Sequence, residues 1–156
     1  MKNYHEDVRD KFKAPASKYP VIMLIDNDNG ANSIYEAIAG ITKKPKPAGV
    51  GDFIYVTGNL YVVPTPLGPG KAKTSIEDLF DSKTLAMPLD GKVFSRAKKI
   101  YESTQIGKAP FALKVVAKNA ETIDFKGFNR ILERVVKVID GYENRRKAVG
   151  SKVGPQ

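Results

Sequence analysis

The sequence predicts an α/β protein in which a mostly parallel sheet is flanked by helices. Three observations support this class. Residues 21–25, "VIMLI", form a continuous apolar run of strand length, a helical repeat of apolar residues follows at once, and another helical repeat lies near the C-terminus. The 156 residues suffice for one domain with a core, since a chain of this size buries about two-thirds of its unfolded surface.

The first 18 residues are a polar lead-in without apolar periodicity. They hold no apolar run of signal-peptide length, and no segment of the sequence reaches the ~18 apolar residues of a membrane span. We therefore expect a cytoplasmic protein that does not contact membranes.

Residues 21–25 are predicted to be a central strand buried on both faces, because a continuous apolar run is typical of such strands. After Gly30 the apolar residues Ile34, Ile38 and Ile41 share one helical face, and "TKKPKPAGVG" ends that helix. The segment is thus strand, acidic turn, helix.

Two β-rich runs follow at 53–57 and 60–63. Gly58 and Asn59 separate them, which predicts a hairpin. Ser75 is then a candidate N-cap for a short helix, "IEDLF", and residues 81–91 are predicted to be a loop.

Three further apolar stripes predict helices. They comprise Val93, Phe94, Ala97, Ile100 and Tyr101; Phe111, Ala112, Val115 and Val116; and Phe128, Leu132, Val135, Ile139 and Tyr142. The last stripe is the most regular. We place the folded domain at 19–143 and expect a basic, disordered tail at 144–156.

The net charge of +9 and the isoelectric point near 9.6 suit a polyanionic partner, although a basic surface can also serve solubility alone. The chain has no cysteine, which excludes a cysteine nucleophile and a thiolate metal site.

Asp26 and Asp28 follow the apolar strand directly. If the backbone stays extended, the two carboxylates point to the same side, at the end of a strand where open α/β sheets bind ligands. A divalent cation would relieve their repulsion, and a site built only of oxygen ligands suits Mg²⁺ or Mn²⁺. The structural alternative is that Asp26 and Asn29 serve as turn and N-cap residues.

Glu77 and Asp78 open the predicted helix after the Gly/Pro loop, where acidic residues complement the helix dipole. Alternatively they supply a second metal position. Lys108 could neutralise a phosphate or be an ordinary surface lysine, and His5 is expected to be a bystander. The stretch "LGPGKAKT" lacks the spacing of a nucleotide-binding P-loop.

The stretch "PVIMLIDNDNGA" resembles the D-x-D motif of the TOPRIM fold, found in topoisomerases, primases and certain nucleases. More particularly, the chain resembles the C-terminal TOPRIM region of bacterial retron reverse transcriptases, which are RNA-directed DNA polymerase/endonuclease fusions. The similarity runs from about residue 19 to 142 and includes "SIEDLF", "GKAPFALKVV" and "IDFKGFNRIL".

This resemblance implies a Rossmann-like fold and Mg²⁺-dependent cleavage of nucleic-acid phosphodiesters, with DNA favoured over RNA as the partner. Asp26 and Asp28 would hold the metal ion. Glu77 and Asp78 would match the acidic helix start that contributes to a second ion, and Lys108 would match a late lysine that stabilises the phosphate.

The sequence departs from the TOPRIM pattern at one point. TOPRIM domains carry a metal-binding or catalytic Glu, usually followed by Gly, at the end of an earlier apolar strand; Glu6 lies in "NYHEDVRD", which has neither feature. We therefore expect a chain that begins inside a TOPRIM domain, an incomplete metal centre, and an isolated chain that could lack activity. The missing strand would leave a sheet edge open, through which a homodimer could form.

Two other functions stay open. A basic module could bind nucleic acid without cleaving it, and its binding would then be steeply dependent on salt. Phosphotransfer to an Asp nucleophile also uses a D-x-D motif, but the usual form has Thr or Val where this chain has Gly30.

Overall fold

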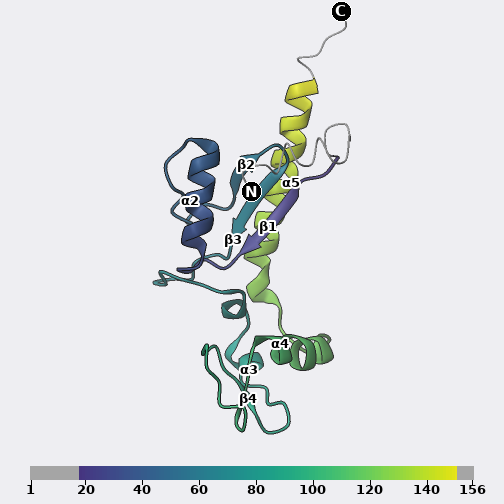
Figure 1. Ribbon diagram of the computed structural model, residues 1–156. Helices are drawn as coiled ribbons and strands as arrows, with labels where there is room; N and C mark the ends of the chain where they lie inside the picture. The colour runs from purple at the N-terminus through teal and green to yellow at the C-terminus, as the bar shows by residue number, and fades with distance from the viewer. Residues whose placement is uncertain (1–17, 151–156) are drawn as a thin grey trace, which may run out of the picture. The chain divides into compact units, whose positions relative to one another are not determined.

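The computed structural model describes residues 18–150 (Figure 1). The chain divides into two compact units. Among residues 18–150, the first comprises 18–75 and 130–150, and the second is Ile76–Asn129. The lead-in at 1–17 and the end of the predicted tail at 151–156 lie outside the described residues.

The first unit holds a three-stranded sheet with the order β1-β3-β2. Strand β1 (Val21–Ile25) runs parallel to β3 (Leu60–Pro64), and β2 (Ile54–Thr57) is antiparallel to β3. Gly58 has φ 53°, which the tight β2–β3 turn needs and glycine adopts easily. The predicted hairpin and the α/β class are confirmed. The sheet is mixed rather than mostly parallel, because a tight hairpin joins only antiparallel strands.

Helices α2 (Ala31–Thr42) and α5 (Asn129–Gly150) flank this sheet (Figure 1). On the α2 side, Tyr35 and Ile38 join the strand residues Ile25, Val56, Leu60 and Val62 in one buried cluster. On the α5 side, the Tyr142 ring meets Tyr61 of β3 edge to face, with centroids 6.3 Å apart. Because side chains alternate along a strand, β3 is buried on both faces.

Strand β1 has the predicted bounds but not the predicted surroundings. Val21 and Leu24 are 42% and 48% exposed. Within residues 18–150, β1 pairs with β3 alone and is therefore an edge strand. The expectation of a central strand buried on both faces is corrected for this reason.

The second unit is built from short elements. They are η1 (Ile76–Leu79), α3 (Ser82–Leu85), β4 (Val93–Phe94), β5 (Gln105–Ile106), α4 (Lys108–Pro110), the π-helix η2 (Phe111–Val116), and the 3-10 turns η3 (Ala117–Asn119) and η4 (Lys126–Phe128). Phe111 and Val115 lie in its core, and the Phe111 ring stacks on Phe94 at 4.3 Å.

Two predictions in this unit are corrected. The helix expected over residues 93–101 is absent, because Val93 and Phe94 pair in parallel with Gln105 and Ile106. Within the predicted loop at 81–91, Asp81 caps the short helix α3 by accepting a hydrogen bond from the Thr84 backbone N–H. The apolar residues from 111 to 116 are helical, as predicted.

Helix α5 is the predicted C-terminal helix, and it continues to Gly150. Its buried residues are Ile131, Arg134, Val138 and Tyr142. Of the residues in the predicted stripe, Leu132 and Ile139 are instead exposed, at 58% and 40%. No helix among the described residues has the length and apolarity needed to cross a bilayer.

Candidate metal centre at the end of strand β1

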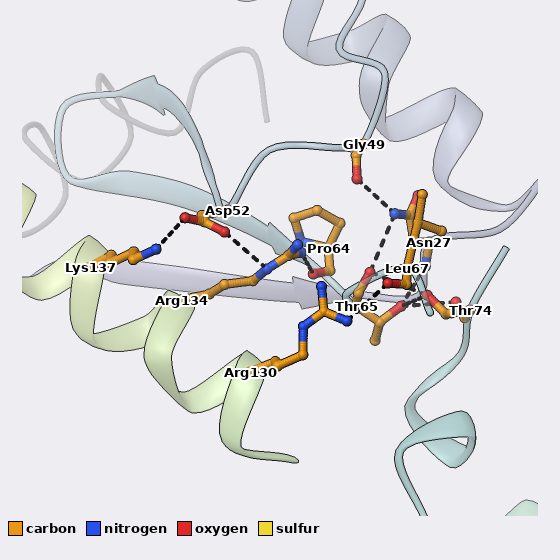
Figure 2. A network of polar contacts seen from close by, with 10 residues as sticks. All are labelled: Asn27, Gly49, Asp52, Pro64, Thr65, Leu67, Thr74, Arg130, Arg134 and Lys137. Carbon is orange, nitrogen blue, oxygen red and sulfur yellow. Dashed lines mark hydrogen bonds and ion pairs between the residues drawn. The ribbon is translucent and has the colours of Figure 1, made fainter. Parts of the chain in front are cut away.

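Asn27, between the two aspartates, is the buried centre of the acidic turn (Figure 2). Its side-chain amide donates to the carbonyls of Gly49 at 2.8 Å and Thr65 at 3.3 Å, and its Oδ1 accepts from the Tyr35 hydroxyl at 3.3 Å. Burial raises the pKa of that tyrosine, although the Arg134 charge opposes the shift. One amide group thus joins the acidic turn to a loop, to the end of β3 and to α2.

The backbone of the turn is held in the same way. The Asn27 N–H donates to the Thr74 carbonyl at 2.8 Å and to the Thr65 hydroxyl at 2.9 Å, and the Thr74 N–H donates back to the Asn27 carbonyl. The hydroxyls of Thr65 and Thr74 are 2.9 Å apart, and both residues are buried. These contacts fix the backbone on which the two aspartates sit.

Asp26 is half-buried and Asp28 is exposed, on either side of the buried Asn27. Asp28 Oδ1 accepts a hydrogen bond from the Gly30 N–H at 2.7 Å, which is an Asx turn. Helix α2 then begins after Gly30 without a side-chain cap, so Asn29 is not the N-cap that the structural alternative proposed. Asp28 makes the Asx turn here.

Carboxylate oxygens such as those of Asp26 and Asp28 are ligands that suit a hard cation. Mg²⁺ keeps several water ligands and often takes only one or two carboxylates from the protein. Within residues 18–150, no group of three or more His, Cys, Asp or Glu side chains is placed to hold a metal ion. The candidate centre in the described chain is therefore the Asp26 and Asp28 pair, without a third acidic ligand.

Glu77 and Lys108 belong to the second unit, where they are brought together. Lys108 Nζ lies 3.0 Å from Oε1 of Glu77, whose side chain is 8% exposed. Asp78 forms a 2.8 Å ion pair with Arg96. Both acidic side chains at the start of η1 are thus neutralised by basic residues.

Helix α5 adds a basic group to the first unit that the sequence did not reveal (Figure 2). The Arg134 side chain, only 7% exposed, donates to the Pro64 carbonyl at 2.7 Å, and its Nε lies 3.5 Å from Asp52. Burial lowers the pKa of Arg134, while the charge of Asp52 opposes that shift. Arg134 thereby ties α5 to the last residue of β3.

Two neighbouring cations on α5 reinforce this tie. Lys137 forms a 2.6 Å ion pair with Asp52, and its hydrogen bond is the largest cause of the lowered pKa of that carboxyl. Arg130 is exposed and donates to the Leu67 carbonyl, just after β3, at 3.0 Å. Cationic groups therefore contact the chain at and beyond the end of β3, beside the end of β1 in the same sheet.

The sequence gives only a weak signal for Arg134 and Asn27, the residues that organise this region. Arg134 is three residues after Ile131 and four before Val138, which places it on the buried face of α5. Asn27 alternates with two acidic residues, so an extended backbone turns its side chain the other way. Comparison with models of known protein families finds no match, and comparison with solved structures finds no significant match.

Proposed function

We propose that the chain is a metal-dependent nuclease module of the TOPRIM type, related to the endonuclease region of retron reverse transcriptases. The observation that carries this proposal is the acidic turn. A buried, fully engaged asparagine holds two carboxylates at the carboxyl end of a parallel strand. This is where open α/β sheets place their ligands.

In this proposal Asp26 and Asp28 hold Mg²⁺ or Mn²⁺, which when bound polarises a phosphodiester and activates water. Asn27 positions the two carboxylates through its contacts with Gly49 and Thr65. Arg130 is exposed and can contact the phosphate backbone. The roles of Glu77 and Lys108 as second metal ligand and phosphate-stabilising lysine stay predictions.

Metal binding tests the proposal directly. We expect Mn²⁺, followed by calorimetric titration or electron paramagnetic resonance, to bind the full chain, and Asp26→Asn or Asp28→Asn to weaken binding at least about tenfold, because each removes one of two charged ligands. Asp140→Asn is the matched control, since it removes an exposed carboxylate on α5.

Nicking of plasmid DNA in Mg²⁺ is the second measurement. Cleavage that is lost in the Asp26→Asn variant supports nuclease activity at this turn. Metal binding without cleavage supports a metal centre that is incomplete. If the full chain binds no Mn²⁺, or if Asp26→Asn and Asp140→Asn bind it equally well, the acidic turn is purely structural.

A second candidate is a basic module that binds nucleic acid without cleaving it. The observation in its favour is the net charge of +9, together with an acidic turn that has no third acidic ligand among the described residues. Its binding would survive substitution of both aspartates.

A further inference from the structure

The outer edge of β1 carries its own row of backbone groups. The Val21 N–H donates to Asn59, and the Ile25 carbonyl accepts from Thr65, so the odd-numbered residues of β1 face β3. Backbone groups alternate along a strand, and those of Ile22 and Leu24 therefore face the opposite edge. Among residues 18–150, no strand pairs with that edge.

Helix α5 carries a second apolar stripe that the first unit leaves exposed. Leu132, Val136 and Ile139 are 58%, 53% and 40% exposed. At 3.6 residues per turn they lie roughly 80–140° around the helix from the buried Ile131. We call these three residues the α5 flank.

Contacts of α5 with the sheet show on which side this flank lies. On one side of the helix, Arg145 stacks 3.7 Å over Tyr55 of β2 and Lys137 pairs with Asp52. On the other, Arg146 donates to the carbonyl of Lys18, three residues before β1. Ile139 and Leu132 precede Arg146 by seven and fourteen residues and share its face, so the α5 flank lies on the β1 side.

Leu24 extends this apolar surface onto the strand itself. It is paired in register with Val63, which lies two residues from Tyr61 and hence on the same face of β3. Tyr61 meets Tyr142 of α5, so Leu24 also faces the α5 layer, with 48% of its surface exposed. Among the described residues, a strand edge without a paired strand and the exposed α5 flank thus lie on the same side of the unit.

We propose that a second copy of the chain covers this surface. Strand β1 pairs antiparallel with β1 of the copy across a two-fold axis, and the two α5 flanks pack together on one face of the joined sheet. An isologous interface uses the same patch on both partners, and an antiparallel pair of identical edge strands has this symmetry.

The position of Val136 favours a second copy over a lone added strand. A strand paired with β1 lies in the sheet layer, whereas Val136 is roughly 140° around α5 from the face that meets the sheet. Covering Val136 requires a helix beside α5 as well as a strand beside β1, and a second copy brings both. The three side chains of the flank are uncharged.

The test is sedimentation equilibrium of the full chain over a concentration series. We expect a reversible monomer–dimer equilibrium, with Val136→Lys raising the dissociation constant at least tenfold because it places two like charges in the interface. Val50→Lys is the matched control, since Val50 is exposed in the same unit at 72% and lies outside the flank.

Leu24→Pro tests the strand edge separately. The Leu24 N–H faces away from β3, so proline removes no bond of the β1–β3 ladder but blocks pairing at the outer edge. Circular dichroism confirms folding of each variant. More salt should maintain or strengthen the dimer, since it screens repulsion between two basic chains, whereas association bridged by nucleic acid would weaken.

A chain that stays monomeric throughout the series overturns the proposal, as does a dimer that the folded Val136→Lys variant forms as well as the Val50→Lys control. If Leu24→Pro fails to fold, the Val136→Lys comparison still decides.

Discussion

At the scale of single residues, the middle position of D-x-D organises the turn. The pattern draws attention to Asp26 and Asp28, and their position after a strand could be predicted from the apolar run before them. The role of Asn27 could not, because its partners Gly49 and Thr65 lie 22 and 38 residues away in the sequence. The role of this buried amide depends on contacts that form only in the folded unit.

Asn27→Ala is expected to destabilise the protein by about 1–3 kcal/mol, because it removes the side-chain donor to the buried Gly49 carbonyl and one of the two side-chain donors to the Thr65 carbonyl. Urea denaturation followed by circular dichroism measures the change. Asn29→Ala, at an exposed position of the same turn, should cost much less. Equal losses for the two variants would show that the buried amide network adds nothing to stability.

At the scale of elements, local signals predicted most of the first unit and less of the second. Strand β1, helix α2 and the β2–β3 hairpin each follow from a continuous apolar run, a helical repeat or a Gly-Asn turn. The segment 93–101 has helical spacing, yet Val93 and Phe94 pair with β5, since a non-local strand contact overrides a short periodic pattern. In α5 the predicted stripe combines buried and exposed residues because the helix has two apolar faces.

Two glycines in helical segments should respond to alanine in opposite ways. Gly40 lies in α2 with no neighbouring atom within reach of an added Cβ, so Gly40→Ala should raise stability by about 0.5–1 kcal/mol. In η4, a Cβ on Gly127 would overlap the backbone carbonyl of Leu79, and Gly127→Ala should cost roughly 1–3 kcal/mol.

Chemical denaturation of both glycine variants provides the measurement, and each serves as the control for the other. A stable Gly127→Ala variant would mean that η4 and η1 can separate at little cost. A destabilised Gly40→Ala variant would contradict the open space beside α2.

At the scale of the whole molecule, the excess of basic residues gives the chain a net charge of +9. Composition alone established this charge, whereas the division into two compact units depends on long-range contacts that no local pattern encodes. Charge acts at long range and without regard to geometry, so it predicts affinity for nucleic acid more readily than it predicts a site.

Nucleic-acid binding by this charge should weaken steeply with salt. With a labelled DNA duplex in the presence of a chelator, the logarithm of the binding constant should fall linearly with the logarithm of salt concentration, with a slope of about 0.9 per phosphate contact. Fluorescence anisotropy measures it. Asp26→Asn should bind as well as the unmodified chain or slightly better, because it removes one negative charge.

A flat dependence on salt would exclude binding driven by charge. Binding that collapses in Asp26→Asn even without divalent ions would instead show that this carboxylate contacts the nucleic acid or supports the fold around it.

The Asn27 contacts join residues that are far apart in the sequence, so the acidic turn forms only when the first unit folds. Gly49, Thr65 and Thr74 all follow it in the sequence, so the turn is complete only after the chain has formed the β2–β3 hairpin and returned to close the bridge at Thr74. The unfolded chain has no such turn, and a metal ion held there would bind only the folded state. Its binding free energy would then add to the stability of the unit. A substitution that lowers the stability of the folded unit would then also lower its apparent affinity for the metal ion.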